Sequence, residues 1–184
     1  MHLEIFNDLP TLETERLSLR QIGIKDTDDV FAFTSNPKTS EWLTWDPHKT
    51  KEDSLNFIKS VLEKYQKNQP AQWAIELKSE KKVIGLCGFV NFFEEHSKGE
   101  VAYVLSPDYW GKGFLPEALI KIIEFSFKQL GLIRIEAKCE VGNFASEKVM
   151  QKVGMIQEGL FIKYLKRKGE SRSYKLFAII YDKK

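Results

Sequence analysis

The sequence predicts a mixed α/β (α+β) fold in which helices flank a central, mostly antiparallel sheet of seven strands. Short runs of alternating polar and apolar residues recur along the chain, as expected of half-buried strands. Three of these runs are separated only by short polar turns, which favours antiparallel hairpins. Helical runs separate most of the other strands and can provide crossovers. A doubly wound dinucleotide-binding fold would alternate strand and helix from the start, and this chain does not.

The N-terminal third predicts one strand and two helices. These elements cover residues 17–19, 26–35 and 50–68. Thr50, with Asp53 three residues later, has the spacing of a capping box, which satisfies backbone N–H groups at a helix start. Pro70 lies just beyond the second helix and cannot continue it. The segment 36–47 between the helices contains two tryptophans and is expected to be irregular.

The remaining part of the chain predicts six strands and two helices. In chain order they are strands at 72–78, 83–92 and 100–105, a helix at 115–130, a strand at 133–139, a helix at 143–153, and strands at 155–164 and 174–181. Gly131 and Gly154 directly follow the two helices, where a glycine commonly ends a helix. The basic stretch 163–172 between the last strands is either a solvated hairpin or a surface for an acidic partner.

The composition is that of a soluble globular protein, with 42% hydrophobic residues, 29% charged residues and a net charge of +2. We expect one domain over residues 1–184. The charge is too balanced to indicate nucleic acid, and no apolar run suits a signal peptide or a membrane span, so a cytoplasmic location is expected. Cys87 and Cys139 lie in apolar strand-like runs and are expected to be buried thiols. The histidines lack metal-ligand spacing, and no metal is expected.

The segment 110–119 carries the strongest functional signal. It reads Trp-Gly-Lys-Gly-Phe-Leu-Pro-Glu-Ala-Leu and connects a predicted strand to a predicted helix. A glycine turn at a helix start aims backbone N–H groups at an anion, and Gly111 and Gly113 allow close approach of a ligand. Lys112 adds a cation, and Pro116 and Glu117 suit the first helical turn. The segment therefore predicts a site for an anionic ligand.

Two motifs resemble the GNAT acetyltransferase family, and the resemblance extends over residues 12–181. The first is 110–115, in the register of the family's pyrophosphate-binding loop. The second is 143–150, which is similar to the family's Asn-x-x-Ser helix beside the cofactor. The stretch 100–113 is most similar to the Rim-type branch, which acetylates N-terminal amines of ribosomal proteins and also contains enzymes for small amines and antibiotics.

The resemblance implies acetyl-coenzyme A (acetyl-CoA) as co-substrate, bound between strand 100–105 and the strand that begins near residue 133. The cofactor-binding residues that it implies are Tyr103, Val104, Leu105, Trp110, Gly111, Lys112, Gly113, Phe114, Leu115, Asn143 and Ser146. Backbone groups of Val104 and Leu105 are expected to hold the pantetheine arm, with the Val104 N–H as the oxyanion donor. Trp110 stands where the family usually has Gln or Arg, and Leu115 where it has Gly or Ala.

Direct acetyl transfer to an amine needs a base, an oxyanion donor and an acid for the leaving thiolate. The resemblance implies Glu100 as the base, acting through a water molecule. Ser146 is the candidate acid, because Met150 occupies the position of the family's usual tyrosine and has no proton to donate. The alternatives are that Glu100 is an exposed strand residue, that Ser146 is structural and that Asn143 only caps its helix.

The acceptor amine is expected to bind near Trp42, Trp45 and Asp46, because indole faces and a carboxylate attract a cation. The alternative is that these tryptophans only pack on the core. The expected partners are a small-molecule amine or a protein N-terminus, with no nucleic acid and no membrane, for a monomer or homodimer. Leu115 and Met150 leave open a non-catalytic coenzyme-A-binding module.

Overall fold

An eight-stranded sheet forms the centre of residues 4–182, the part of the chain that the computed structural model describes. The strands are β1 (Leu12–Glu13), β2 (Leu17–Arg20), β3 (Gln72–Leu77), β4 (Lys82–Phe93), β5 (Lys98–Leu105), β6 (Arg134–Glu140), β7 (Ile156–Arg167) and β8 (Glu170–Ile180). Their order across the sheet is β1-β2-β3-β4-β5-β6-β8-β7, and only β5 and β6 pair in parallel. The mixed, mostly antiparallel fold is confirmed. The predicted count of seven strands was one short, because a two-residue strand is too short to show alternation.

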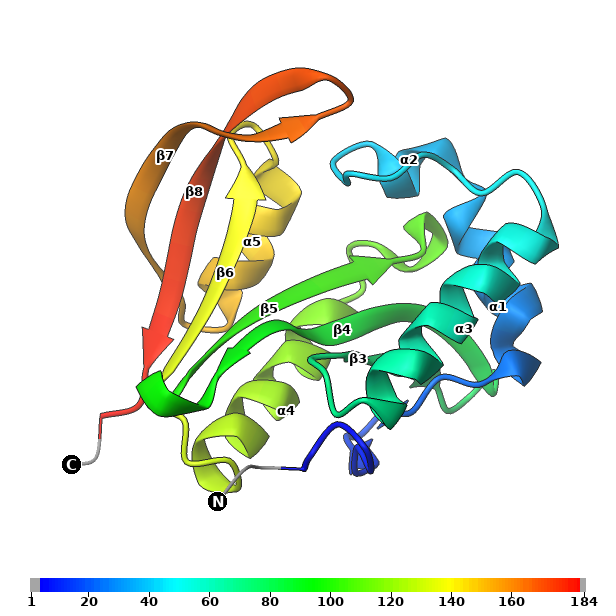
Figure 1. The fold of residues 1–184 in the computed structure, drawn as a ribbon, viewed down its shortest axis with the longest axis horizontal. Helices are drawn as coiled ribbons and strands as arrows, with labels where there is room; N and C mark the ends of the chain where they lie inside the picture. Colours follow the sequence, from blue (N-terminus) through cyan, green and yellow to red (C-terminus); the bar gives the residue numbers. More distant parts are fainter. Residues whose placement is uncertain (1–3, 183–184) are drawn as a thin grey trace.

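Five α-helices flank the sheet in the described residues. They are α1 (Thr27–Thr34), α2 (Pro37–Ser40), α3 (Lys51–Gln66), α4 (Phe114–Lys128) and α5 (Phe144–Lys152). The predicted capping box is present at α3, where the Thr50 hydroxyl accepts from the Asp53 N–H and the Asp53 carboxylate accepts from the Thr50 N–H. The segment 36–47, expected to be irregular, contains the single-turn helix α2, which Asn36 caps. The helices α1 and α3 pack together, apart from α4 (Figure 1).

The sheet divides where β5 and β6 stop pairing. Their parallel register runs only from Lys98 opposite Arg134 to Glu100 opposite Glu136. Beyond this point β5 continues along β4, and β6 continues along β8 (Figure 1). A register shift in β4 between Phe89 and Asn91 lies opposite the end of the paired stretch, and such irregularities bend a strand. The two halves of the sheet therefore diverge and leave their facing strand edges unpaired with one another.

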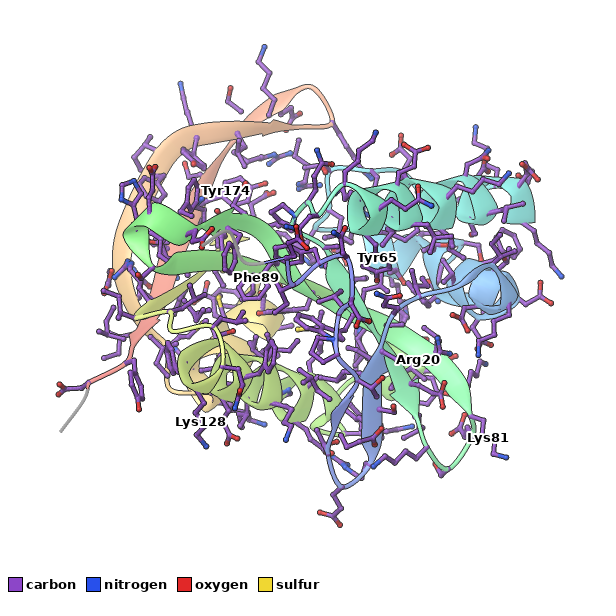
Figure 2. All side chains as sticks on the ribbon, turned by 60° about the horizontal axis from the view of Figure 1, so that its bottom comes forward. Arg20, Tyr65, Lys81, Phe89, Lys128 and Tyr174 are labelled. Carbon is purple, nitrogen blue, oxygen red and sulfur yellow. The ribbon has the colours of Figure 1, made fainter. Side chains whose placement is uncertain are left out.

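The core lies between the sheet and the helices and accounts for most of the apolar pattern of the sequence. Figure 2 shows Phe89 and Tyr65 directed into this interior, where they are 1% and 4% exposed. The Trp73 indole is fully buried, and its N–H donates to the Pro10 carbonyl at 2.8 Å. The free thiols of Cys87 and Cys139 are buried, as the apolar runs around them predicted. Met150 is also fully buried, so it is a core side chain.

Candidate functional site

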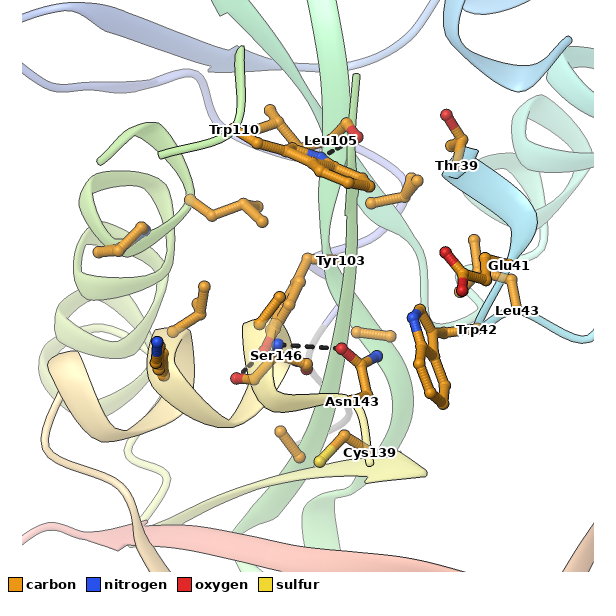
Figure 3. A pocket seen from close by; sticks show the side chains of 18 of the residues that line it. Thr39, Glu41, Trp42, Leu43, Tyr103, Leu105, Trp110, Cys139, Asn143 and Ser146 are labelled. Carbon is orange, nitrogen blue, oxygen red and sulfur yellow. Dashed lines mark hydrogen bonds between the residues drawn. The ribbon is translucent and has the colours of Figure 1, made fainter. Parts of the chain in front are cut away.

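A pocket of about 430 Å³ opens where β5 and β6 diverge. Its walls are the end of β5, the end of β6, the glycine loop before α4, one side of α5 and the segment that contains and follows α2. Figure 3 shows Glu41 and Trp42 on one side of this pocket, with Tyr103 and Ser146 across from them. The structure therefore brings together three regions that the sequence marked separately, namely the glycine loop, the Asn143 helix and the tryptophan-containing segment.

The glycine loop presents an uncapped helix start to the pocket. Gly111 and Gly113 have φ values of +75° and +82°, a left-handed conformation that favours glycine. Gly113 is the N-cap residue of α4 and has no side chain with which to satisfy the N–H groups of the first turn. Free N–H groups at the positive end of a helix dipole form a binding site for phosphate-like anions. The geometry therefore fits the anionic ligand that the sequence predicted.

Arg16 holds this loop against the N-terminal strands. Its Nε and its backbone N–H donate to the Glu117 carboxylate at 2.7 and 3.0 Å, and its Nη1 donates to the Lys112 carbonyl at 3.0 Å. Burial raises the pKa of Glu117, but hydrogen bonds from Thr14 and Arg16 outweigh this effect and keep the pKa below its usual range. Sequence reasoning missed Arg16, because no local spacing relates it to a loop about a hundred residues away in the chain.

The remaining loop side chains form the border of the site. The Trp110 indole N–H donates to the Leu105 carbonyl at 2.9 Å, which ties the loop to β5 (Figure 3). Leu115 lines the pocket and also packs against the core. Phe114 is buried beneath the Arg16 guanidinium, whose carbon lies 4.4 Å from the ring centroid. Lys112 does not line the pocket, and its ammonium instead lies 5.2 Å from the Tyr109 ring centroid.

The alternation of hydrogen bonds along β5 contradicts the expectation that the Val104 N–H is the oxyanion donor. The Ser106 N–H donates to the Ile84 carbonyl, and Val104 lies opposite Leu86 in the same antiparallel ladder. In such a ladder, residues whose N–H and C=O groups face the partner strand alternate with residues whose groups face away from it. Val104 is two residues from Ser106, so its N–H is also directed toward β4. It is therefore not placed to be the oxyanion donor. The same alternation directs the backbone groups of Tyr103 and Leu105 toward the divergent edge.

Tyr103, Ser146 and Asn143 form a hydrogen-bonded cluster on the α5 side of the pocket (Figure 3). The two hydroxyl oxygens of Tyr103 and Ser146 are 2.8 Å apart. The Asn143 side chain accepts from the Ser146 N–H at 3.1 Å and caps α5. Burial raises the pKa of Tyr103, with a smaller opposing effect from Ser146, so the phenol stays neutral. The Ser146 hydroxyl is therefore held next to a proton-bearing partner.

Glu100 lies beside the pocket without lining it. Its carboxylate accepts from the Lys138 ammonium at 2.9 Å and from the Asn91 amide at 3.1 Å. Burial lowers the pKa of Lys138, but the hydrogen bond and charge of Glu100 raise it above its usual value overall. Lys138 does line the pocket. The Glu100 carboxylate is thus connected to the pocket wall through its ion pair with Lys138.

The structure separates the three residues predicted to bind the acceptor. Trp42 lines the pocket, but Trp45 and Asp46 do not. The Trp45 ring packs 5.5 Å from the His48 ring, and the exposed Asp46 carboxylate pairs with Lys168 at 3.3 Å. Glu41 lines the pocket beside Trp42, as do three residues that sequence reasoning missed, namely Lys38, Thr39 and Leu43. Their only sequence signal is proximity to the tryptophan.

The other polar groups near the pocket favour anion binding over a covalent nucleophile. Lys148 and Lys152 line the pocket from α5, and neither makes an ion pair within residues 4–182. Cys139 also lines it, but burial raises the pKa of its thiol to about 12. A thiol in this state is a poor nucleophile. Within the same residues, no helix combines the length and apolar character needed to cross a membrane.

Comparisons with known proteins agree with this geometry. The family described as acetyltransferase (GNAT) domain matches residues 16–156. The uncharacterized N-acetyltransferase p20 of Bacillus licheniformis is 33% identical over 94% of this chain and 97% of its own length. A GNAT-family acetyltransferase structure from Bacillus anthracis is 30% identical, with a TM-score of 0.83 over 93% of this chain and 98% of that one. The ribosomal-protein-S5-alanine acetyltransferase of Vibrio fischeri is 26% identical, with a TM-score of 0.81 over 95% and 98% of the two chains.

Proposed function

This chain belongs to the GNAT acetyltransferase family and is an acetyl-CoA-dependent N-acetyltransferase, and on that premise we propose that its acceptor is the N-terminal amine of a protein or peptide. One observation carries the assignment of the site. The uncapped, glycine-flanked start of α4 and the Ser146 hydroxyl border a single pocket at the split of the sheet. Anion binding and proton donation are thereby available in one cavity. We also propose that residues 1–184 form one catalytic domain.

The residues present fit acetyl-CoA. The backbone N–H groups of Gly111, Gly113, Phe114 and Leu115 would hold its diphosphate, because their helix start has no cap of its own. The cofactor, when bound, supplies an acetyl group activated as a thioester. Asn143, Lys148 and Lys152 would contact its polar groups from α5. Tyr103 and Leu105 would bind it through backbone groups, and Val104 would form part of the wall.

Ser146 is the proposed acid, and Tyr103 is its hydrogen-bond partner. A neutral phenol 2.8 Å from the serine oxygen can donate to it, which leaves the serine proton free to be directed into the pocket. The backbone N–H of Tyr103, and not that of Val104, is the proposed oxyanion donor, because it is directed toward the divergent edge. Tyr103 would therefore serve twice, with its hydroxyl as the partner of the acid and with its backbone N–H as the oxyanion donor.

Glu100 is the proposed base, acting through a water molecule. Its position beside Lys138 keeps the carboxylate ordered next to the cavity wall. An α-amine has an ordinary pKa of about 7.7–8.0, so a modest base suffices to deprotonate it near neutral pH. A lysine side chain, at about 10.4, would need a stronger base. This difference favours an N-terminal amine over a lysine ε-amine.

Glu100→Gln is expected to lower the transfer rate about tenfold below pH 7 and by much less above pH 9. Below its pKa the amine is protonated and needs a base, whereas above its pKa it is already neutral. The measurement is a pH profile of kcat/KM for the amine. Glu136→Gln is the matched control, because Glu136 lies opposite Glu100 in the sheet but pairs with Arg134 and Lys98. A loss that is equal at all pH values, or equal in the control, would assign Glu100 a structural role.

The acceptor class is tested with a library of peptides that differ in their first residue, together with alkyl, aryl and polyamine compounds. Acetylated products are identified by mass spectrometry in the presence of acetyl-CoA. The proposal expects peptides with free N-termini to be acetylated in preference to their Nα-blocked, lysine-containing counterparts. Turnover confined to small amines would instead support the second candidate, small-amine or antibiotic acetylation. That candidate is favoured by Trp42 and Glu41, an indole and a carboxylate that line the pocket across from Ser146.

A further inference from the structure

The tip of the β7–β8 hairpin reaches the segment that follows α2, part of which lines the pocket. Figure 1 shows the tip of this hairpin, coloured orange, beside the loop at α2. Two ionic or hydrogen-bonding contacts connect them. The Arg167 Nη1 donates to the Glu41 carbonyl at 2.8 Å, and the Lys168 ammonium lies 3.3 Å from the Asp46 carboxylate. Elements more than a hundred residues apart thus meet at the acceptor side of the pocket.

Arg167 is the centre of this contact. Its Nε and Nη2 donate to the two oxygens of the Glu140 carboxylate at 2.5 and 3.0 Å, a bidentate geometry. The side chains of Arg167 and Glu140 are only 12% and 5% exposed, so this pair is shielded from water. The hydrogen bonds that Arg167 donates to Glu140 raise the pKa of Arg167 further, so the guanidinium stays charged. Arg172 provides a second cation at 3.7 Å from Glu140.

Trp42 is positioned by the same arginine. The guanidinium carbon of Arg167 lies 5.8 Å from the Trp42 ring centroid, within the range of a cation–π contact. The edge of the indole also approaches the backbone at Gly142, where an added Cβ would lie 3.6 Å from the ring atom Cη2. The indole therefore lies close to both the hairpin and the turn after β6, which together limit its movement. Because Trp42 lines the pocket, this confinement shapes the pocket wall.

Glu41 is left free to face an incoming amine. Arg167 contacts its backbone carbonyl and not its carboxylate. The Glu41 side chain lines the pocket, is exposed, and forms no ion pair with any residue of the described chain. A carboxylate beside an indole face is a suitable environment for an ammonium group. The arginine thus orders the segment while leaving its acidic side chain available.

We propose that Arg167 is a positioning residue of the acceptor site, which holds Glu41 and Trp42 in place for a cationic amine. The inference rests on the proposed function, in that the wall opposite Ser146 receives the acceptor. It adds that the β7–β8 hairpin is part of that wall, although no residue of the hairpin tip reaches the reacting atoms. Arg167 contacts the end of β6 and the segment after α2, and within the described residues it has no hydrogen bond or ion pair to α4 or α5, which form the donor side.

Arg167→Met is expected to raise the KM for the amine about tenfold, the effect of losing a charge-assisted hydrogen bond, and to leave the KM for acetyl-CoA within about twofold. The amine is the one in the library above that gives the highest turnover. Hydrogen–deuterium exchange of residues 41–46 in the protein without substrates should also become faster. Arg167→Lys, which keeps the charge but loses the forked geometry, should give a smaller change of the same kind. Arg167→Lys tests the same inference if Arg167→Met does not fold.

Arg134→Met is the matched control. Arg134 makes the same kind of forked pair with Glu158, also between β6 and β7, but at the opposite end of β6. It should lower the melting temperature without changing the KM for the amine or the exchange of residues 41–46. Unchanged exchange of residues 41–46 in both Arg167 variants would overturn the inference, as would equal effects from Arg134→Met. If no amine is turned over, the proposed function fails, and the exchange comparison alone still decides the role of Arg167.

Discussion

Gly113→Val is expected to abolish the rise in melting temperature that acetyl-CoA gives the wild-type protein. At a ligand concentration of about 100 times Kd, binding adds about 2.7 kcal/mol of stability, which corresponds to a rise of about 5–10 °C for a chain of this size. The φ of +82° at Gly113 is strongly unfavourable for a β-branched residue. A side chain there also projects next to Arg16, whose Nη2 lies 3.5 Å from the position of the added Cβ. The loop must therefore rearrange, and the N–H groups of α4 lose their common direction.

Gly131→Val is the matched control for backbone strain. Gly131 follows the other end of α4, has a φ of +66°, and has no atom within 4 Å of an added Cβ. Both variants should lose about 1–2 kcal/mol of intrinsic stability, the typical cost of a left-handed non-glycine residue. Only Gly131→Val should retain the stabilisation by acetyl-CoA. A full ligand-induced rise in Gly113→Val, measured by thermal unfolding, would refute the assignment of the loop.

Ser146→Ala is expected to reduce kcat about a hundredfold, the lower range for loss of a proton donor, with little change in the KM for acetyl-CoA. The helix should tolerate the substitution, because Asn143 caps α5 through the Ser146 backbone N–H and alanine is a good helix former. Tyr103→Phe should give a smaller loss. In the Ser146→Ala background it should cause no further loss, because the phenol is proposed to act through the serine hydroxyl.

Ser126→Ala is the matched control for Ser146→Ala. Ser126 is a buried helical serine whose hydroxyl donates to the Ile122 carbonyl of its own helix, away from the pocket. Its kinetics should match those of the wild type. If Ser146→Ala weakened acetyl-CoA binding without slowing single-turnover transfer, Ser146 would be a binding residue. If the Tyr103 and Ser146 effects multiplied independently, the proposed coupling of the two hydroxyls would be wrong.

Local pattern was sufficient to predict most of the fold. The capping box at Thr50 and the glycines after α4 and α5 marked helix boundaries through local chemistry. The alternation in β3, β4 and β5 and the short turns between them predicted neighbouring antiparallel strands, which the register confirms. What local pattern could not show was the divergence of β5 from β6, because it depends on how far two strands remain paired in space.

The candidate site likewise contains parts that local sequence patterns predict and parts that they do not. The glycine loop and the Asn143 helix carry local signals, and the structure places both at one pocket. Arg16 and Arg167 carry none, since each acts on a segment roughly a hundred residues away. The direction of the Val104 N–H depended on the phase of the β4–β5 ladder, which a single strand sequence does not specify. Tryptophan content marked the acceptor segment but could not distinguish Trp42 from Trp45.

The central claim is that acetyl transfer to an amine takes place in the pocket between the α4 loop and Ser146. The most direct measurement is the release of free coenzyme A thiol from acetyl-CoA, with and without amine, by the wild type, Gly113→Val and Ser146→Ala. The account predicts amine-dependent release by the wild type, loss in Gly113→Val that high acetyl-CoA partly restores, and loss in Ser146→Ala that it does not. Amine-dependent release that is unchanged in both variants would contradict it.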